Sequence, residues 1–181
     1  MPAVTRTHQS KASAREMTWP LQTYITLVAV PTAAAWARRL VVEELGTWGL
    51  VALAETVELL VSELVTNALR ASDDVDPVLA ERYQRQPNAV KYEDLVKISC
   101  VRLRMSANGR KLLLEVWDKS PQPPAAADLD KDELPHLESE SGRGLFLVAT
   151  CSAQWGWYYP ADHKSQGMPE WGKVVWCIAD L

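Results

Sequence analysis

Two side chains suited to phosphoryl chemistry, Glu63 and Asn67, lie four residues apart in one apolar segment of the chain. In a helix, this spacing places both side chains on the same edge, one turn apart. The amide oxygen of Asn67 can ligate magnesium, and the carboxylate of Glu63 can orient or deprotonate a nucleophile. A solvated helix edge is the commoner setting for such a pair, so the pair alone leaves both interpretations open.

A further candidate, Asp118, ends a predicted strand at residues 111–118. Strand alternation puts Asp118 on the face that we expect to meet the core. The other residues on that face are apolar: Leu112, Leu114 and Val116. A carboxylate in this position needs hydrogen-bond donors, and an adenine amino group in a pocket over the sheet is one. The backbone N–H groups of Lys119 and Ser120, in the turn Lys119, Ser120, Pro121, are the alternative donors.

Two glycines, Gly142 and Gly144, flank Arg143 where an acidic loop leads into a predicted helix at residues 144–150. Without side chains, glycines let the backbone approach a ligand, and a helix start presents unpaired N–H groups to phosphate oxygens. Arg143 can add a charged contact. Many helices begin after a glycine, so this segment is weak evidence by itself.

The elements that must position these residues follow from apolar periodicity and from turn residues along the chain. We expect, in order, a strand at 23–30, helices at 31–45 and 53–71, strands at 96–105 and 111–118, a helix at 144–150, and strands at 154–159 and 173–179. Asn108 and Gly109 suit a tight hairpin turn, and 73–93 and 121–141 are expected as an insertion and a mobile loop. This order predicts an α/β two-layer sandwich, in which helices cover one face of a mixed, mostly antiparallel sheet.

Apolar side chains of the helix at 53–71 recur at three- and four-residue spacing and predict one buried stripe. The stripe consists of Val57, Leu60, Val61, Leu64, Val65 and Ala68. We also expect Trp36, Trp48 and Trp176 in the core. Leu113 and Trp117 point to the opposite sheet face, which a partner, a second copy in a homodimer or the N-terminal tail would cover.

The chain has 181 residues, 48% of them hydrophobic, which suits a single domain at 23–181 after a flexible tail at 1–22. Its net charge of −4 argues against direct nucleic-acid binding, which needs a basic face. No uncharged apolar run is long enough for a membrane helix. The three cysteines form no CxxC pair, which favours reduced thiols in a cytoplasmic protein.

Four sequence segments stand in an order that is typical of one superfamily. They are SELVTNAL at 62–69, VWDKSPQPP at 116–124, SGRGLFLV at 141–148 and WGKVVW at 171–176. Together they resemble the N box, the two glycine boxes and the last strand of the GHKL, or histidine-kinase-like, ATP-binding fold. Residues 36–45 and 47–50 are also similar to the first helix and turn of the anti-sigma-factor serine/threonine kinases, a branch of this superfamily.

The resemblance implies a role for each acidic or amide candidate. Glu63 would be the activating carboxylate of the reaction. Asn67 would bind magnesium and link it to the triphosphate of ATP. Asp118 would accept a hydrogen bond from the adenine amino group.

The glycine boxes would hold the nucleotide between them. Ser120 would stand where many relatives have the glycine of the first box. The second box would consist of Gly142, Arg143, Gly144 and Leu145, at the hinge of an ATP lid formed by residues 125–140.

Three positions depart from the pattern of the superfamily. Ala71 stands where relatives often have a histidine, and Val174 stands where they have a threonine near adenine. Glu140 stands where some relatives have a basic residue that meets the terminal phosphate, a role that Arg143 could take over.

The activity implied by the resemblance is transfer of the γ-phosphoryl group of ATP to a serine or threonine of an anti-anti-sigma-like antagonist protein. The protein would also bind a transcription factor such as a sigma factor. The alternative is a binding module in which ATP only sets the shape of the protein. Glu63 favours the kinase, whereas the three departures favour the module.

Overall fold

The structure is a computed structural model that describes residues 18–72, 99–124, 140–160 and 171–181, together with residues 78, 81, 82, 85 and 169. Among these residues, the sheet has five strands in the order β1-β2-β3-β5-β4, and each neighbouring pair is antiparallel. The strands are β1 (Leu21–Val28), β2 (Cys100–Ala107), β3 (Lys111–Asp118), β4 (Gln154–Tyr158) and β5 (Lys173–Asp180). The α-helices of the described part are α2 (Ala33–Thr47), α3 (Ala54–Arg70) and α6 (Glu140–Cys151).

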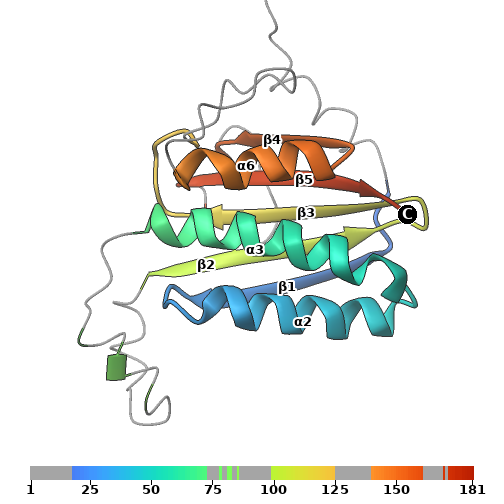
Figure 1. Ribbon diagram of the computed structural model, residues 1–181, viewed down its shortest axis with the longest axis horizontal. Helices are drawn as coiled ribbons and strands as arrows, with labels where there is room; N and C mark the ends of the chain where they lie inside the picture. The colour runs from blue at the N-terminus through green and yellow to red at the C-terminus, as the bar shows by residue number, and fades with distance from the viewer. Residues whose placement is uncertain are drawn as a thin grey trace, which may run out of the picture.

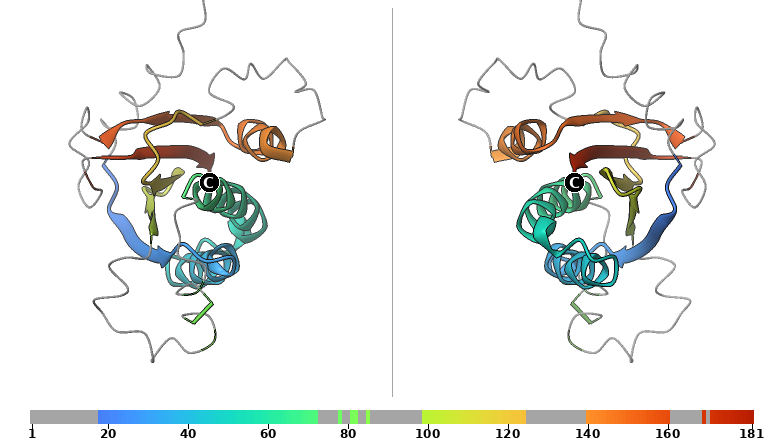
Figure 2. Two further views of the ribbon diagram at one scale, coloured as in Figure 1. Left: turned by 90° about the vertical axis from the view of Figure 1, so that its left-hand side faces the viewer. Right: turned by 90° about the vertical axis from the view of Figure 1, so that its right-hand side faces the viewer.

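These elements form two layers, with α2, α3 and α6 on one face of a curved sheet (Figures 1 and 2). A single 3-10 turn, η1 (Val51–Leu53), leads into α3. The predicted α/β sandwich is therefore confirmed, although the described strands contain no parallel pair. The predicted insertion, apart from a few single residues, and the predicted lid up to residue 139 lie outside the described residues.

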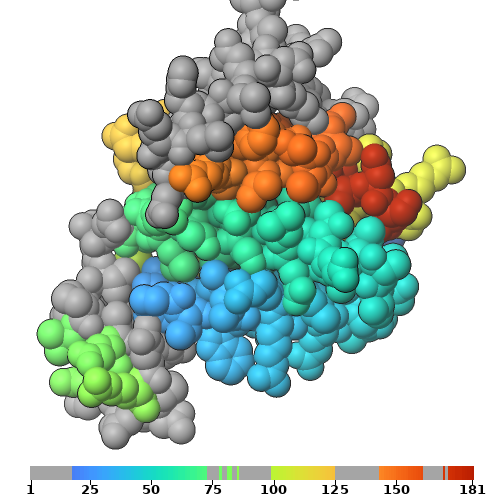
Figure 3. Space-filling view, viewed as in Figure 1, coloured from blue at the N-terminus to red at the C-terminus, as the bar shows by residue number. Residues whose placement is uncertain are grey.

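Helix α3 is the central element of the helical layer, between α2 and α6 (Figure 3). All six residues of its predicted stripe are buried, and they pack into one core with the inner face of the sheet. This stripe fixes the rotation of α3 about its own axis, because turning the helix would expose apolar area at roughly 25 cal/mol per Å². The edge that carries Glu63 and Asn67 is fixed with it.

Helix α2 packs against the edge of the sheet at β1 through a stripe of apolar side chains that recur every four residues. They are Ala33, Ala37, Val41 and Leu45. Trp36 lies outside this stripe and is 53% exposed, with Arg39 over its ring, so the prediction that Trp36 is a core residue is wrong. Trp176 is fully buried as predicted, and the half-buried Trp48 packs against the main core.

The hairpin between β2 and β3 forms at the predicted dipeptide. Gly109 has a φ of 79°, in the left-handed region that favours glycine. The side-chain oxygen of Asn108 accepts hydrogen bonds from the N–H groups of Arg110 and Lys111. This turn sets the pairing of β2 with β3, so that the side chains of β3 alternate between the two faces as the sequence predicts.

Part of the sheet face opposite the helices, over β3, β4 and β5, is also buried. Its apolar cluster consists of Leu113, Trp117, Tyr158, Val174, Trp176 and Ile178, and Trp19 and Cys100 pack against it. Trp19 belongs to the predicted tail, so the end of that segment covers part of the face. None of the described helices is long and apolar enough to cross a membrane.

A buried charge lies within this second cluster. The carboxylate of Glu115 on β3 is fully buried, and Arg104 on β2 forms an ion pair with its Oε2. The hydroxyl group of Tyr158 on β4 donates a hydrogen bond of 2.9 Å to Oε1. The guanidinium of Arg104 also lies over the ring of Tyr24 on β1. These contacts link four strands beside the apolar cluster.

We predict that Arg104→Met lowers the free energy of unfolding by about 3–5 kcal/mol, because the buried carboxylate of Glu115 loses its paired cation. The matched control is Arg110→Met, in the exposed turn between the same two strands, which should change stability by about 0.5 kcal/mol or less. Urea denaturation of both variants measures the difference. Equal stability of the two variants would contradict a structural role for the Glu115 ion pair.

Candidate functional site

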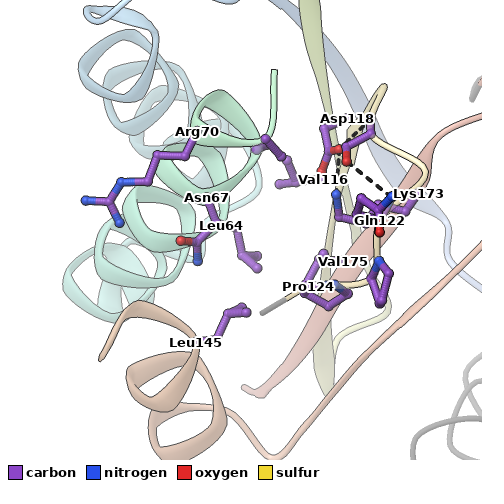
Figure 4. A pocket seen from close by; sticks show the side chains of 14 residues that line it. Leu64, Asn67, Arg70, Val116, Asp118, Gln122, Pro124, Leu145, Lys173 and Val175 are labelled. Carbon is purple, nitrogen blue, oxygen red and sulfur yellow. Dashed lines mark hydrogen bonds and ion pairs between the residues drawn. The ribbon is translucent and has the colours of Figure 1, made fainter. Parts of the chain in front are cut away.

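A cavity of about 270 Å³ lies between α3, the start of α6 and the adjacent ends of β3 and β5 (Figure 4). Helix α3 and the residue after it contribute Leu64, Asn67, Ala68, Arg70 and Ala71. The sheet contributes Val116, Asp118, Lys173 and Val175, and α6 contributes Leu145. The segment after β3 contributes Ser120, Gln122, Pro123 and Pro124. The walls are largely apolar, with a few polar groups that can orient a ligand.

Asp118 is the acidic group of this pocket, and its side chain is almost fully buried, as strand alternation predicts. Its Oδ1 accepts a 2.9 Å hydrogen bond from the N–H of Ser120, which is the turn contact that the sequence offered as an alternative. The same Oδ1 accepts a 2.7 Å hydrogen bond from Nζ of Lys173. Within the described chain both contacts use Oδ1, so Oδ2 is available to a donor in the pocket.

Burial raises the pKa of the Asp118 carboxyl group above its ordinary value, and the hydrogen bond and charge of Lys173 oppose that rise. The cause is desolvation, which disfavours the charged form of a carboxylate. Lys173 therefore matters for the charge state of Asp118 as well as for its orientation. Sequence reasoning missed this lysine.

The residues that lead into β5 hold Lys173 in place. Asp118 pairs with Lys173 in the antiparallel register of β3 and β5. Gly172 has a φ of 78°, and a Cβ atom at this position would collide with the carbonyl oxygen of Asp118. The indole N–H of Trp117 donates a 2.7 Å hydrogen bond to the carbonyl oxygen of Trp171. Three successive residues of one segment thus contact the last two residues of β3.

The segment after β3 forms one wall of the pocket through local turn contacts. The hydroxyl oxygen of Ser120 accepts a hydrogen bond from the N–H of Gln122. The hydroxyl group of Tyr159 donates a 2.9 Å hydrogen bond to the carbonyl oxygen of Pro121. Ser120 lines the pocket, and its N–H and its hydroxyl oxygen are both engaged in the turn.

Glu63 and Asn67 lie on the edge of α3 that faces α6. A Cβ atom added to Gly144 would collide with Oε2 of Glu63 and would stand 3.3 Å from Nδ2 of Asn67. The predicted carboxylate, amide and glycine therefore meet at one place. Asn67 lines the pocket, whereas Glu63 lies one helical turn away, about 6 Å along the axis, and is not a lining residue.

The glycine segment differs from the prediction in its secondary structure. The helix begins at Glu140, so Gly142, Arg143 and Gly144 lie in its first turns instead of preceding it. The first amide groups of a helix have no partner within it, so the amides near Gly142 and Arg143 remain candidates for anion binding. Of the predicted residues here, buried Leu145 lines the pocket, whereas exposed Arg143 does not.

The three residues that depart from the superfamily pattern lie in different parts of the structure. Ala71 lines the pocket, where it offers no polar side chain. The expectation that Val174 takes the place of a pocket threonine is wrong, because Val174 packs in the cluster on the opposite sheet face. In β5 the residues that face the pocket are its neighbours Lys173 and Val175. Glu140 is the first residue of α6.

No curated protein matches the chain. A family model described as "Histidine kinase-like ATPase domain" matches residues 26–158. The matched range extends from β1 to the end of β4 and includes Glu63, Asn67, Asp118 and Gly144. It covers well over half of the chain, and the antiparallel sheet covered by helices agrees with the fold of this family. The chain therefore belongs to the histidine kinase-like ATPase domain family.

Proposed function

We propose that this protein binds ATP with magnesium and transfers the γ-phosphoryl group to a serine or threonine of an antagonist protein. The observation that carries the proposal is the convergence of Glu63, Asn67 and Gly144 at the point where Asn67 lines the pocket. Asp118 lines the same pocket from the end of β3. A nucleotide would extend from Asp118 towards α6, with its phosphates near Asn67 and the terminal phosphate nearest to Glu63.

The part of the pocket around Asp118 suits adenine, since Oδ2 of Asp118 can accept a hydrogen bond from an amino group. Leu64, Val116 and Val175 supply apolar surface for the faces of a purine ring. In the same pose, guanine would present a carbonyl oxygen to the carboxylate, and two acceptors repel each other.

The part of the pocket around Asn67, where we place the phosphates, offers a ligand atom that suits magnesium. Nδ2 of Asn67 is buried and has no hydrogen-bond partner among the described residues, so this amide is not committed to an internal contact. The oxygen of the same amide is a ligand that magnesium accepts. Magnesium bound there would neutralise charge on the phosphate oxygens. The first amide groups of α6 would add donors for the same oxygens.

Glu63 has the position of the base in the transfer step. The hydroxyl oxygen of the partner's serine or threonine attacks the γ-phosphorus while its proton passes to the Glu63 carboxylate. The new oxygen–phosphorus bond replaces the bond to the β-phosphate, and ADP leaves with that electron pair. Glu63 lies outside the cavity lining and is only half-buried, so part of its side chain is accessible to a partner's hydroxyl group.

The partners proposed for this chain follow from its resemblance to the anti-sigma-factor kinases. The likeness to this branch rests on residues 36–45 and 47–50, and the segments around Glu63, Asp118 and Gly144 carry the likeness to the superfamily. It supports an anti-anti-sigma-like antagonist as the phosphorylated protein and a sigma factor as a second partner.

A non-catalytic module is the second candidate, and Ala71 favours it. This residue lines the pocket with a methyl group where relatives often carry a histidine. In such a module ATP would set the affinity for a protein partner without phosphoryl transfer, and Glu63 would have no chemical step to perform.

We predict that ATP binds in the presence of magnesium roughly tenfold or more tightly than GTP, because only adenine donates to Asp118. Asp118→Asn should reduce this preference, since the mutant amide can turn its N–H towards the guanine oxygen. Isothermal titration calorimetry measures both affinities. Equal binding of ATP and GTP to the wild-type protein would contradict the adenine-reading role of Asp118.

We predict that Glu63→Gln keeps ATP affinity within a few-fold while phosphotransfer falls by roughly a hundredfold or more. The substitution keeps the size of the side chain and removes the base. Asn67→Ala should instead abolish most nucleotide binding, because it removes a group that acts in the ground state. Glu55→Gln is the matched control, an exposed carboxylate two turns earlier on α3, and should leave both quantities unchanged.

The measurement is transfer of label from γ-labelled ATP to a small protein in cell extract, together with calorimetry on the same variants. If the wild-type protein binds ATP but labels nothing, the non-catalytic module replaces the kinase. The same conclusion follows if Glu63→Gln transfers phosphate as fast as the wild-type protein.

A further inference from the structure

Lys173 is a buried cation that the proposed reaction does not use. It is 4% exposed, lines the pocket and makes a 2.7 Å hydrogen bond to Oδ1 of Asp118. An ammonium group has three N–H donors. Within the described residues, this hydrogen bond engages one of them, and two remain. A buried ammonium group is costly unless its donors find acceptors, so the pocket is suited to a ligand that supplies one.

The acceptor has to lie next to the group that meets Asp118, because Lys173 and Asp118 are in hydrogen-bond contact on one wall of the pocket (Figure 4). In adenine, the amino group that donates to Asp118 is flanked by the ring nitrogens N1 and N7. The sugar and phosphates are attached to N9 and must extend towards Asn67, so the six-membered ring enters first. N1 belongs to that ring and is the more basic of the two nitrogens.

We propose that Lys173 is a specificity-determining residue that donates a hydrogen bond to N1 of adenine while Asp118 accepts one from the amino group. The inference rests on the proposed ATP binding and adds the way in which the base is read. A donor and an acceptor side by side match the adenine edge at two adjacent atoms. Guanine in the same pose presents an acceptor to Asp118 and the N1 hydrogen to the ammonium group, so both contacts are lost.

One further observation supports this role. The residues of β5 that line the pocket are Lys173 and Val175, whereas Val174 between them packs on the opposite face of the sheet. Lys173 supplies a polar donor on the pocket face of the same strand.

The test is calorimetry on the full chain with magnesium and three nucleotides: ATP, 1-deaza-ATP, which lacks N1, and 7-deaza-ATP, which retains it. For the wild-type protein, loss of N1 should weaken binding roughly tenfold or more, whereas loss of N7 should change it by a few-fold at most. For Lys173→Met, ATP should bind at least as weakly as 1-deaza-ATP binds to the wild-type protein, because Asp118 also loses its paired cation. Removing N1 should then have no further effect.

The matched control is Lys111→Met. Lys111 forms an ion pair with Asp180 at the opposite end of the same two strands, outside the pocket. This variant should keep the wild-type order of the three nucleotides. Lys173→Arg retains a charged donor and should keep a penalty for removing N1, which a purely structural role of the lysine would not require.

An equal penalty for 1-deaza-ATP in the wild-type protein and in Lys173→Met would overturn the inference. If Lys173→Met does not fold, similar affinity of the wild-type protein for ATP and 1-deaza-ATP would overturn it as well. A wild-type protein that binds no ATP would overturn both this inference and the proposed function. ATP binding with the predicted N1 dependence but without phosphotransfer would remove only the kinase activity.

Discussion

The packing of α3 is the constraint on which the rest of the structure depends. Its buried stripe contacts the inner face of the sheet, while its two sides contact α2 and α6. A helix held on three sides cannot rotate without opening its core contacts, and cores are packed too tightly to absorb such a change. Glu63 and Asn67 thus owe their position to apolar residues that touch no ligand, and the polar edge of α3 faces the glycine of α6 for the same reason.

The second constraint is electrostatic and lies at the other end of the pocket. Asp118 and Lys173 are both buried, and each would be costly to keep charged without the other. Another ion pair, between Arg104 and Glu115, lies on the opposite face of the sheet. β3 therefore carries a buried carboxylate on each of its faces, and its neighbours β2 and β5 supply the two cations. Such pairs also act against slippage of the strands, because a shift of one residue would separate both.

Local patterns predicted the parts of the fold that depend on neighbouring residues in the sequence. The stripe of α3, the turn at Gly109 and the burial of Asp118 all follow from spacing or from backbone preference. The setting of Trp36 did not follow, because a tryptophan in an apolar helix suggests burial, while the four-residue repeat of α2 turns this position outwards.

The contact between Asp118 and Lys173 was missed for a different reason. The two residues are 55 positions apart, and nothing near either of them reveals the register that pairs β3 with β5. If one buried residue of β5 had been assigned to a face of the sheet, the alternation of side chains along the strand would have placed Val174 on the face away from the pocket. The meeting of Glu63 with Gly144 joins two helices in the same way and requires the tertiary structure.

The close approach of Gly144 to α3 also bears on how this sequence can diverge over evolutionary time. A residue with a side chain at position 144 would need the space that Oε2 of Glu63 now fills. Drift at this position is therefore coupled to positions 63 and 67, because a larger residue would require the carboxylate of Glu63 to turn away or to be shortened. Among descendants of this chain, the identity of one small residue on α6 would then record whether the acidic group on α3 still holds this position.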